Sequence, residues 1–317
     1  MTTFNPNDHR LRIEQYLGRT LGERVRLVGV RELAKSTRDA PWRLDVEVEG
    51  QAQSFVLRPE SRRIEHEYRV LRAVESLPVP APRAYGWDPA GEALGMPCFF
   101  YDYVEGESLL DHMLAGEPWA DELYIDTACA LQSVTRDRLP DATDLFEDGE
   151  SAADVLDDAY AYFQANPDPV PAAAGLADAA YARLKETLPA LPGPHFSNGD
   201  LWPDNLIVRD RQLEGVIDWA LAGFSDPIFE FLLPFFLRPT LRGRGIEARY
   251  CQRMGFDPGL LPWYHGLEFF DSWRWVRATG QPYEQHTDES LQADLARWLG
   301  SPFLARGGSQ SAALPTA

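Results

Sequence analysis

Residues 195–230 have the sequence HFSNGDLWPDNLIVRDRQLEGVIDWALAGFSDPIFE. It contains three side chains suited to chemistry, Asp200, Asn205 and Asp218. Asp200 and Asn205 bracket a short loop. Pro203 within it excludes a regular helix or a central strand, because proline lacks an N–H and restricts the residue before it.

Two apolar runs follow this loop, Leu206–Val208 and Leu213–Ile217, with the polar residues 209–212 between them. This pattern predicts a β-hairpin. A hairpin returns its far end to its start, so we expect Asp218 to lie beside Asn205.

The expected grouping has one amide and one carboxylate facing a shared space, with a second carboxylate nearby. Oxygen ligands of this kind suit Mg²⁺, which keeps waters or phosphate oxygens as its remaining ligands. Asp200 could then accept a proton from a hydroxyl, a division of roles typical of kinase-type phosphoryl transfer. The alternative is that these loop residues only cap helices and form turns, as Asp and Asn commonly do.

The motif resembles the catalytic signature of the aminoglycoside phosphotransferase-like family, which consists of small-molecule kinases with the protein-kinase fold. Asn198 stands where that family usually has histidine, and an asparagine can still hydrogen-bond to the neighbouring metal-binding segment. The resemblance implies that Asp200 is the catalytic base and that Asn205 and Asp218 hold Mg²⁺. The matching residues are Asn198-Gly199-Asp200, Asn205, Ile217-Asp218-Trp219 and Asp226-Pro227.

The first hundred residues predict three antiparallel strands followed by a helix, which is how a kinase N-lobe begins. Strands are expected over Val25–Leu33, Trp42–Val48 and Gln53–Arg58, the second of which alternates cleanly between apolar and charged residues. Residues 61–77 predict an amphipathic helix with Glu67 inside its apolar stripe.

Glu67 needs a partner if it is buried, and Arg58 at the end of the third strand is the expected one. The resemblance implies that Arg58 contacts the nucleotide phosphates where kinases use lysine, and that Glu67 holds it. Arginine keeps the charge and offers a planar fork for phosphate oxygens. The alternatives are a solvent-exposed Arg58 and a Glu67 that pairs with Arg63 or Arg69 at the rim.

The turn between the first two strands would cover the phosphates in a kinase. It lacks a GxGxxG motif, although Lys35, Ser36 and Thr37 and their backbone could contact a phosphate. Alternatively, the segment is only a polar hairpin tip.

Residues Cys98–Tyr103, CFFYDY, predict a buried strand. The resemblance places the adenine-contacting hinge here, with Tyr101 and Tyr103 in an aromatic slot and backbone groups recognising the base. Without the resemblance, this run would be only a core strand.

Residues beyond Gly106 are expected to be mainly helical. Asp226 is interpreted as a structural hydrogen-bond acceptor, and Pro234 is expected to kink or break a helix over Ile228–Leu237. The aromatic and acidic residues of Pro262–Thr279 either contact a cationic substrate or, as helical spacing favours, form core.

Composition limits the class of partner. The 317 residues include 30 Lys and Arg against 49 Asp and Glu, a net charge of −19. Such a chain should repel nucleic acid and anionic membranes and attract cationic small molecules, unless the charge serves solubility alone. No long apolar run or signal-like N-terminus is found, and the three cysteines, Cys98, Cys129 and Cys251, suggest reduced thiols, so a cytoplasmic protein is expected.

The sequence thus predicts an α/β (α+β), two-lobed, protein-kinase-like fold. Its N-lobe would span 1–103 and its C-lobe 104–305, with a disordered tail at 306–317. The expected function is transfer of the γ-phosphate of ATP, with GTP left open, to a hydroxyl of a small acceptor. Aminoglycoside-like compounds, other amino sugars, macrolides, amino alcohols and ketosamines remain open as acceptors. The alternative is a catalytically inactive nucleotide-binding or scaffold protein with the same fold. The oligomeric state is not predicted.

Overall fold

The computed structural model describes residues 4–33, 41–59, 63–139, 142–146, 148–167 and 171–300. The chain divides into two compact units. The first comprises Met1–Glu147 and Asn198–Gly223, and the second comprises Asp148–Ser197 and Phe224–Ala317. The first unit therefore holds both the N-terminal sheet and the segment from Asn198 through Asp218, whereas the predicted lobe boundary after residue 103 falls inside it.

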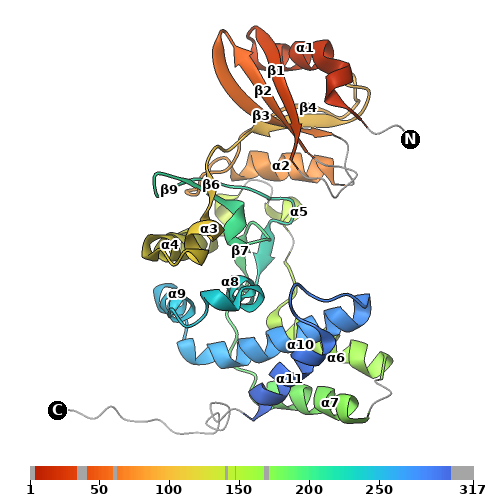
Figure 1. Cartoon of the computed structure of the whole chain (residues 1–317), viewed down its shortest axis with the longest axis vertical. Helices are drawn as coiled ribbons and strands as arrows, with labels where there is room; N and C mark the ends of the chain where they lie inside the picture. The colour runs from red at the N-terminus through yellow and green to blue at the C-terminus, as the bar shows by residue number, and fades with distance from the viewer. Residues whose placement is uncertain are drawn as a thin grey trace, which may run out of the picture. The chain divides into compact units, whose positions relative to one another are not determined.

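A five-stranded antiparallel sheet dominates the N-terminal part of the first unit (Figure 1). Its order is β1-β2-β3-β5-β4, so the three predicted N-terminal strands are adjacent as expected. The strands are β1 (Val25–Glu32), β2 (Trp42–Val48), β3 (Gln51–Pro59), β4 (Ala84–Asp88) and β5 (Cys98–Asp102).

The alternation in β2 places Leu44, Val46 and Val48 on the buried face of this sheet. Helix α1 (Arg10–Leu21), which follows the short 3₁₀ helix η1 (Pro6–His9), packs against the same face. Burial of this apolar surface is what stabilises the small sheet, because three or more strands need a covered face to be stable in water.

Helix α1 also satisfies backbone groups on both outer strands of the sheet. Arg10 donates to the carbonyl of Leu27 in β1 at 2.5 Å, and the carboxylate of Glu14 accepts from the Leu27 N–H at 2.8 Å. At the opposite edge, the hydroxyl of Tyr16 donates to the carbonyl of Gly86 in β4. One helix therefore caps both edges of the sheet.

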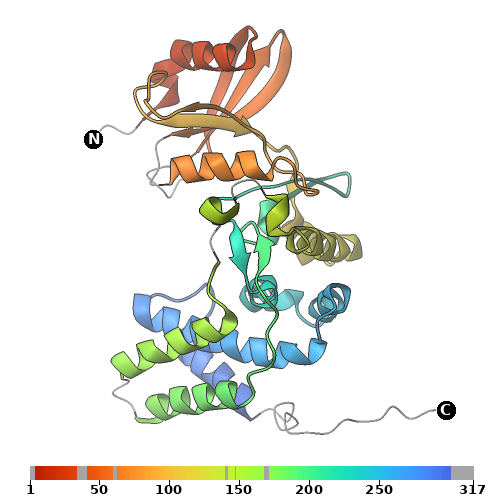
Figure 2. The ribbon, with the colours of Figure 1, turned by 180° about the vertical axis from the view of Figure 1, so that it is seen from behind.

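Helix α2 (Ile64–Val74) is the predicted amphipathic helix, and Figures 1 and 2 show it below the sheet of the first unit. Tyr68 of this helix is half-buried and stacks on Trp87 with ring centroids 5.4 Å apart. The buried positions of α2 are Ile64, Glu67, Val70, Leu71, Ala73 and Val74.

The remainder of the first unit carries the predicted hairpin. Strands β8 (Leu206–Arg209) and β9 (Gln212–Val216) pair antiparallel, and the two-residue strand β6 (Glu107–Ser108), not predicted from the sequence, adds to β8. Helices of this region include α3 (Leu109–Leu114), α4 (Pro118–Gln132), α5 (Ala142–Leu145) and the 3₁₀ helices η2 (Arg136–Arg138) and η3 (Pro203–Asn205).

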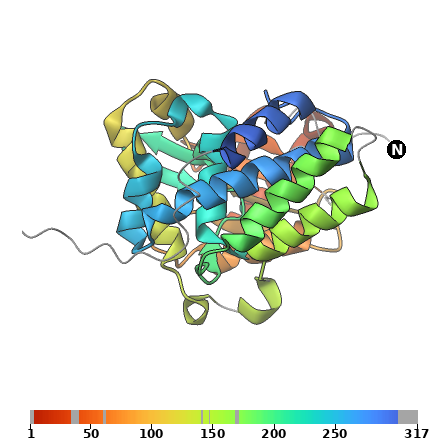
Figure 3. The same cartoon turned by 90° about the horizontal axis from the view of Figure 1, so that it is seen from below.

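The second unit is mainly helical, and α10 packs against four other helices, α6, α7, α8 and α11 (Figure 3). A small sheet pairs β7 (His195–Ser197) with β10 (Gly223–Ser225). The helices are α6 (Ala152–Ala165), α7 (Pro171–Glu186), α8 (Pro227–Leu237), α9 (Ile246–Met254), α10 (Leu261–Thr279) and α11 (Asp288–Leu299), with the 3₁₀ helices η4 (Pro239–Leu241) and η5 (Pro258–Leu260) between them.

Two expectations for this unit can be compared with the structure. Asp226 is a structural acceptor, as predicted: its carboxylate accepts from the N–H groups of Ile228 and Phe229 at 3.0 Å and from the Tyr264 hydroxyl at 2.7 Å. Pro234 does not break α8, which continues to Leu237, because its buried apolar face compensates for one missing backbone hydrogen bond.

The aromatic residues of α10 mostly belong to the core, since Trp263, Tyr264, Phe270 and Trp273 are at most 3% exposed. A membrane-spanning helix is not found in the part of the chain that the structure describes, because no helix there is both long and apolar enough.

Candidate active site

Asp200 and Asn205 are joined by the side chain of Asn205. Its Nδ2 donates to the backbone carbonyl of Asp200 at 3.0 Å and to the carboxylate Oδ2 of Asp200 at 2.8 Å. The single turn of 3₁₀ helix that begins at Pro203 brings them together. Proline suits this position because its lack of an N–H removes a donor that the first turn would leave unbonded.

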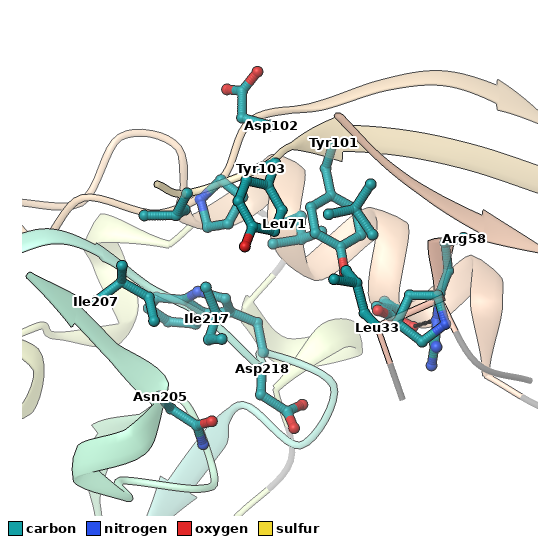
Figure 4. Close-up of a pocket in the computed structure, with 16 residues that line it drawn as sticks. Leu33, Arg58, Leu71, Tyr101, Asp102, Tyr103, Asn205, Ile207, Ile217 and Asp218 are labelled. Atoms are coloured by element: carbon teal, nitrogen blue, oxygen red, sulfur yellow. Dashed lines mark hydrogen bonds and ion pairs between the residues drawn. The ribbon is translucent and has the colours of Figure 1, made fainter. Parts of the chain in front are cut away.

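The hairpin returns the chain to this loop, as its sequence predicts. Leu206 pairs with Val216 across the two strands, and the N–H of Ile217 then donates to the carbonyl of Asn205 at 2.9 Å. Asp218 follows directly. Figure 4 shows the Asn205 amide and the Asp218 carboxylate pointing toward the same space.

Asn198 ties this loop to the segment that carries Asp218. It is fully buried, and its Nδ2 donates to the carbonyl of Asp200 at 2.9 Å, of Asp218 at 3.3 Å and of Ile217 at 3.4 Å. The asparagine that replaces the usual histidine therefore does hydrogen-bond to the neighbouring segment, as expected.

Asp218 is held in an uncommon backbone conformation. Its φ is +56°, in the left-handed region, which Asp and Asn tolerate better than most residues. Such conformations persist where the surrounding structure imposes them, and they concentrate at functional sites. Here the hydrogen bonds from Asn198 to the carbonyls of Ile217 and Asp218, which flank the Cα of Asp218, supply that restraint.

The environment of Asp200 favours its protonated form. Burial raises the pKa of this half-buried carboxyl, the hydrogen bond from Asn205 opposes the rise, and the charge of Asp218 adds to it. A carboxyl with a raised pKa next to a second carboxylate is a frequent arrangement at catalytic sites.

Arg58 and Glu67 form the ion pair that their sequence positions predict. Arg58 Nε lies 2.8 Å from Glu67 Oε2, with side chains 20% and 12% exposed. Burial raises the pKa of Glu67, and the charge and hydrogen bond of Arg58 counteract it. The pairing with Arg63 or Arg69 considered above is not what the structure shows.

Arg58, Glu67, Asn205 and Asp218 line one cavity of about 440 Å³ in the first unit, whereas Asp200 and Asn198 do not. Figure 4 shows Tyr101 and Tyr103 extending toward it, while Asp102 points away. The lining residues are Leu33, Pro41, Val56, Arg58, Glu67, Leu71, Pro82, Tyr101, Asp102, Tyr103, Val104, Asn205, Ile207, Ile217, Asp218 and Trp219.

The end of β5 and the residues that follow it, Asp102–Val104, differ in how their backbone N–H groups are hydrogen-bonded. The N–H of Asp102 donates to Arg83 O and that of Tyr103 to Ser54 O, both at 3.1 Å. For the Val104 N–H, no protein acceptor is found within the described ranges. Val104 lines the cavity together with the aromatic side chains of Tyr101 and Tyr103, and aromatic side chains with a few polar groups are typical of sites that bind a flat heterocycle.

Sequence reasoning missed the apolar walls of the cavity. Leu33, Leu71, Ile207 and Trp219 come from four separate segments of the chain, and apolar side chains of this kind give no functional signal in the sequence. Only the alternation in β8 indicates a cavity-lining residue in the sequence, because it places Ile207 on the opposite face of the strand from the buried Leu206 and Val208. The predicted phosphate-contacting residues Ser36 and Thr37, with Lys35, lie outside the described residues.

The side chains that could hold Mg²⁺ at this site are those of Asn205 and Asp218. Across the described ranges, no three His, Cys, Asp or Glu side chains gather into a metal-binding group. The predicted pair is smaller, one amide oxygen and one carboxylate. Because Asn205 commits its Nδ2 to Asp200, its amide oxygen is left on the side of Asp218 (Figure 4). This pair fits a Mg²⁺ ion that takes its other ligands from water and phosphate.

Comparisons with known proteins identify the family of the chain. The model of the family described as "Phosphotransferase enzyme family" matches residues 42–278. Acyl-CoA dehydrogenase family member 11 of Rattus norvegicus is 24% identical over an alignment of 258 residues, which covers 69% of this chain and 32% of that protein. The chain therefore spans about a third of the length of this curated relative.

Solved structures confirm the predicted fold class. A thermostable mutant of the aminoglycoside phosphotransferase APH(4)-Ia, in ternary complex with ADP and hygromycin B, matches with a TM-score of 0.61 and 17% identity over 94% of this chain and 99% of that chain. A choline/ethanolamine kinase family protein from Mesorhizobium loti matches with a TM-score of 0.59 and 14% identity over 88% and 91%.

Proposed function

Because the chain belongs to the phosphotransferase enzyme family, we propose that it is a small-molecule kinase. It would transfer the γ-phosphate of a nucleoside triphosphate, ATP in the first instance with GTP left open, to a hydroxyl of a small acceptor. The observation that carries this proposal is the Asn205 amide, which binds Asp200 through its nitrogen and leaves its oxygen beside Asp218.

The cavity of the first unit is the proposed nucleotide site. Its aromatic side chains Tyr101 and Tyr103 and the N–H of Val104 suit the base, and Arg58, oriented by Glu67, suits the phosphates. The guanidinium provides a planar fork that matches phosphate oxygens. The APH(4)-Ia structure with bound ADP supports a nucleotide site in this fold.

Asp200 is the proposed base. Its carboxylate would accept a hydrogen bond from the acceptor hydroxyl, align it with the phosphate and take its proton as the new bond forms. Because the transition state of phosphoryl transfer is loose, alignment contributes more than basicity. Mg²⁺ held by Asn205 and Asp218 would offset negative charge on the nucleotide phosphates.

The proposed acceptor is a cationic alcohol such as an amino sugar or an amino alcohol, bound by the region 104–305. The net charge of −19 favours positively charged ligands. Hygromycin B in the APH(4)-Ia complex and the choline/ethanolamine kinase family protein are consistent with this class. The three dispersed cysteines support a reducing, cytoplasmic setting.

The alternative of an inactive, nucleotide-binding scaffold draws on Asn198 in place of histidine. The hydrogen bonds of Asn198 to three carbonyls argue against it, because the loop and the Asp218 segment remain joined. The scaffold would bind nucleotide with Mg²⁺ and turn over no acceptor.

The test is Mg²⁺-dependent nucleotide turnover across amino sugars, macrolides, amino alcohols and ketosamines. Asp200→Ala is compared with Asp204→Ala, because Asp204 is an exposed carboxylate on the same loop. We expect one acceptor class to stimulate turnover, with loss in Asp200→Ala on the order of 10²- to 10⁴-fold and retention in Asp204→Ala. Full turnover in Asp200→Ala would refute the base assignment.

A further inference from the structure

Arg43 on β2 belongs to a partly buried polar cluster beside the cavity. Its Nε lies 2.6 Å from Asp45 Oδ1, and one of its terminal nitrogens donates to Ser54 Oγ at 3.1 Å. Ser54 Oγ in turn donates to Asp45 Oδ1 at 2.8 Å. The Arg43 side chain is only 15% exposed, whereas Arg26 on the neighbouring strand is 65% exposed. The cluster therefore fixes the arginine on the sheet.

The same guanidinium reaches the segment that leaves the sheet after β5. Its carbon lies 4.0 Å from the ring centroid of Tyr103, and its terminal nitrogen lies 2.6 Å from Glu105 Oε1. The backbone N–H of Tyr103 donates to Ser54 O at 3.1 Å. Arg43 and Ser54 thus hold both the side chain and the backbone of Tyr103 against β2 and β3.

Tyr103 lines the cavity and Arg43 does not. Figure 4 shows the tyrosine extending toward the side of the cavity that carries Ile207 and Ile217. Any influence of Arg43 on a bound molecule must therefore pass through Tyr103 or through the backbone that Glu105 helps to hold.

We propose that Arg43 is a positioning residue for nucleotide binding, which acts by immobilising Tyr103 and the 103–105 segment at the wall of the cavity. A planar guanidinium can stack on an aromatic ring and hydrogen-bond to two carboxylates at once, whereas a lysine ammonium cannot. Holding the ring before the ligand arrives removes an ordering cost from binding. This inference rests on the nucleotide site proposed above.

The test is a titration with a fluorescent ATP analogue and Mg²⁺, without acceptor. Arg43→Gln is compared with Arg26→Gln. The second variant breaks a 2.6 Å ion pair between Arg26 and Glu47, which lies on the same sheet but is far more exposed than the cluster around Arg43. We expect Arg43→Gln to raise the Kd for the analogue about fivefold to tenfold, Arg43→Lys to give an intermediate value and Arg26→Gln to change it less than about twofold.

A double-mutant cycle separates positioning from a general structural effect. In a Tyr103→Leu background, Arg43→Gln should raise the Kd by a smaller factor than in the unaltered background, because the ring is gone and only the contact with Glu105 remains. In turnover assays the nucleotide KM should rise, while kcat and the acceptor KM stay unchanged. Should Arg43→Gln fail to fold, Arg43→Lys takes its place in the cycle.

An equal effect in both backgrounds, or no effect beyond that of Arg26→Gln, would overturn the role of Arg43. Failure of the proposed function has a different signature, because the unaltered protein would then bind no nucleotide. Binding by the unaltered protein together with an ineffective Arg43→Gln would leave the nucleotide site standing and remove only this inference.

Discussion

The backbone at Gly199 lies directly against the backbone of Leu221. The φ of Gly199 is +80°, and a Cβ built there would fall well inside the contact distance of the Leu221 carbonyl oxygen. The residue before the proposed base and the chain three residues beyond Asp218 therefore touch at a point where no side chain fits.

We expect Gly199→Ala to destabilise the protein by about 2–5 kcal/mol, since the left-handed conformation and the clash both oppose a methyl group. Thermal unfolding and turnover measure the outcome. Gly193→Ala is the control, because a Cβ there meets nothing within 4 Å. Similar unfolding midpoints for the two variants would contradict this account of Gly199.

Asn198→Leu keeps the approximate size of the side chain and removes its donor. The carbonyls of Asp200, Ile217 and Asp218 lose a hydrogen bond inside the protein. We expect a loss of about 1–3 kcal/mol in the free energy of unfolding and a lower kcat. Denaturant unfolding and steady-state kinetics test this, and an unchanged kcat in a folded Asn198→Leu would show that the link does not support turnover.

The raised pKa of Asp200 predicts the acidic limb of the activity profile. The proposed base acts as a carboxylate, and burial, assisted by the charge of Asp218, favours its protonated form. Activity should therefore fall on acidification with a midpoint above about 3.9, the usual pKa of aspartate. A profile of kcat/KM against pH, which reports the free enzyme, would locate the midpoint, with circular dichroism at each pH to show that the protein stays folded. A midpoint at or below the usual value would contradict the proposed environment.

Asp218→Asn tests the metal assignment without disturbing the fold, because asparagine also tolerates a positive φ. We expect turnover to fall on the order of 1,000-fold and the Mg²⁺-dependent part of nucleotide binding to weaken. Asp210→Asn is the matched control, since Asp210 is exposed and has a φ of +51°. If nucleotide titrations with and without Mg²⁺ gave the same result for Asp218→Asn as for the unaltered protein, Asp218 would not be a ligand.

Glu268 in α10 should lower stability as the pH rises. It is 3% exposed, and its pKa is raised well above the ordinary value by burial and by Asp271, with Arg242 opposing. The folded state favours the protonated form, so this contribution to stability is present at acidic pH and lost as the pH rises through the folded pKa. We expect Glu268→Gln to gain thermal stability relative to the unaltered protein as the pH rises above 4.5, the ordinary pKa of glutamate.

The exposed Glu65→Gln is the control for that comparison and should show no such trend. A difference between Glu268→Gln and the unaltered protein that stays constant with pH would mean that Glu268 does not titrate differently in the folded and unfolded chains.

The parts of the fold that the sequence predicts are those with strong local patterns. Alternation locates β2 at Trp42–Val48, and two apolar runs around a polar turn locate the β8–β9 hairpin. Strands of two or three residues, such as β6 and β7, have no periodicity to detect, because tertiary pairing alone defines them. Helix α11 was missed despite a capping box between Thr287 and Ser290.

The residues of the candidate site also differ in whether the sequence predicts their grouping. Asp200, Asn205 and Asp218 could be grouped in advance because a hairpin brings its two ends together, and Arg58 with Glu67 because a buried carboxylate needs a cation. The residues of the cavity wall could not be predicted, because residues such as Leu71 cannot be distinguished from ordinary core residues by sequence alone. The cluster around Arg43 was missed for the same reason, since nothing in the sequence connects β2 with residues 103–105.

The capping of both sheet edges by α1 has a consequence for self-association. Outer strands are where one protein chain can recruit another by intermolecular strand addition, the first step toward aggregates. Arg10, Glu14 and Tyr16 occupy backbone groups of β1 and β4 that an incoming strand would need. Without the first helix, these backbone groups of β1 and β4 would be open to an incoming strand.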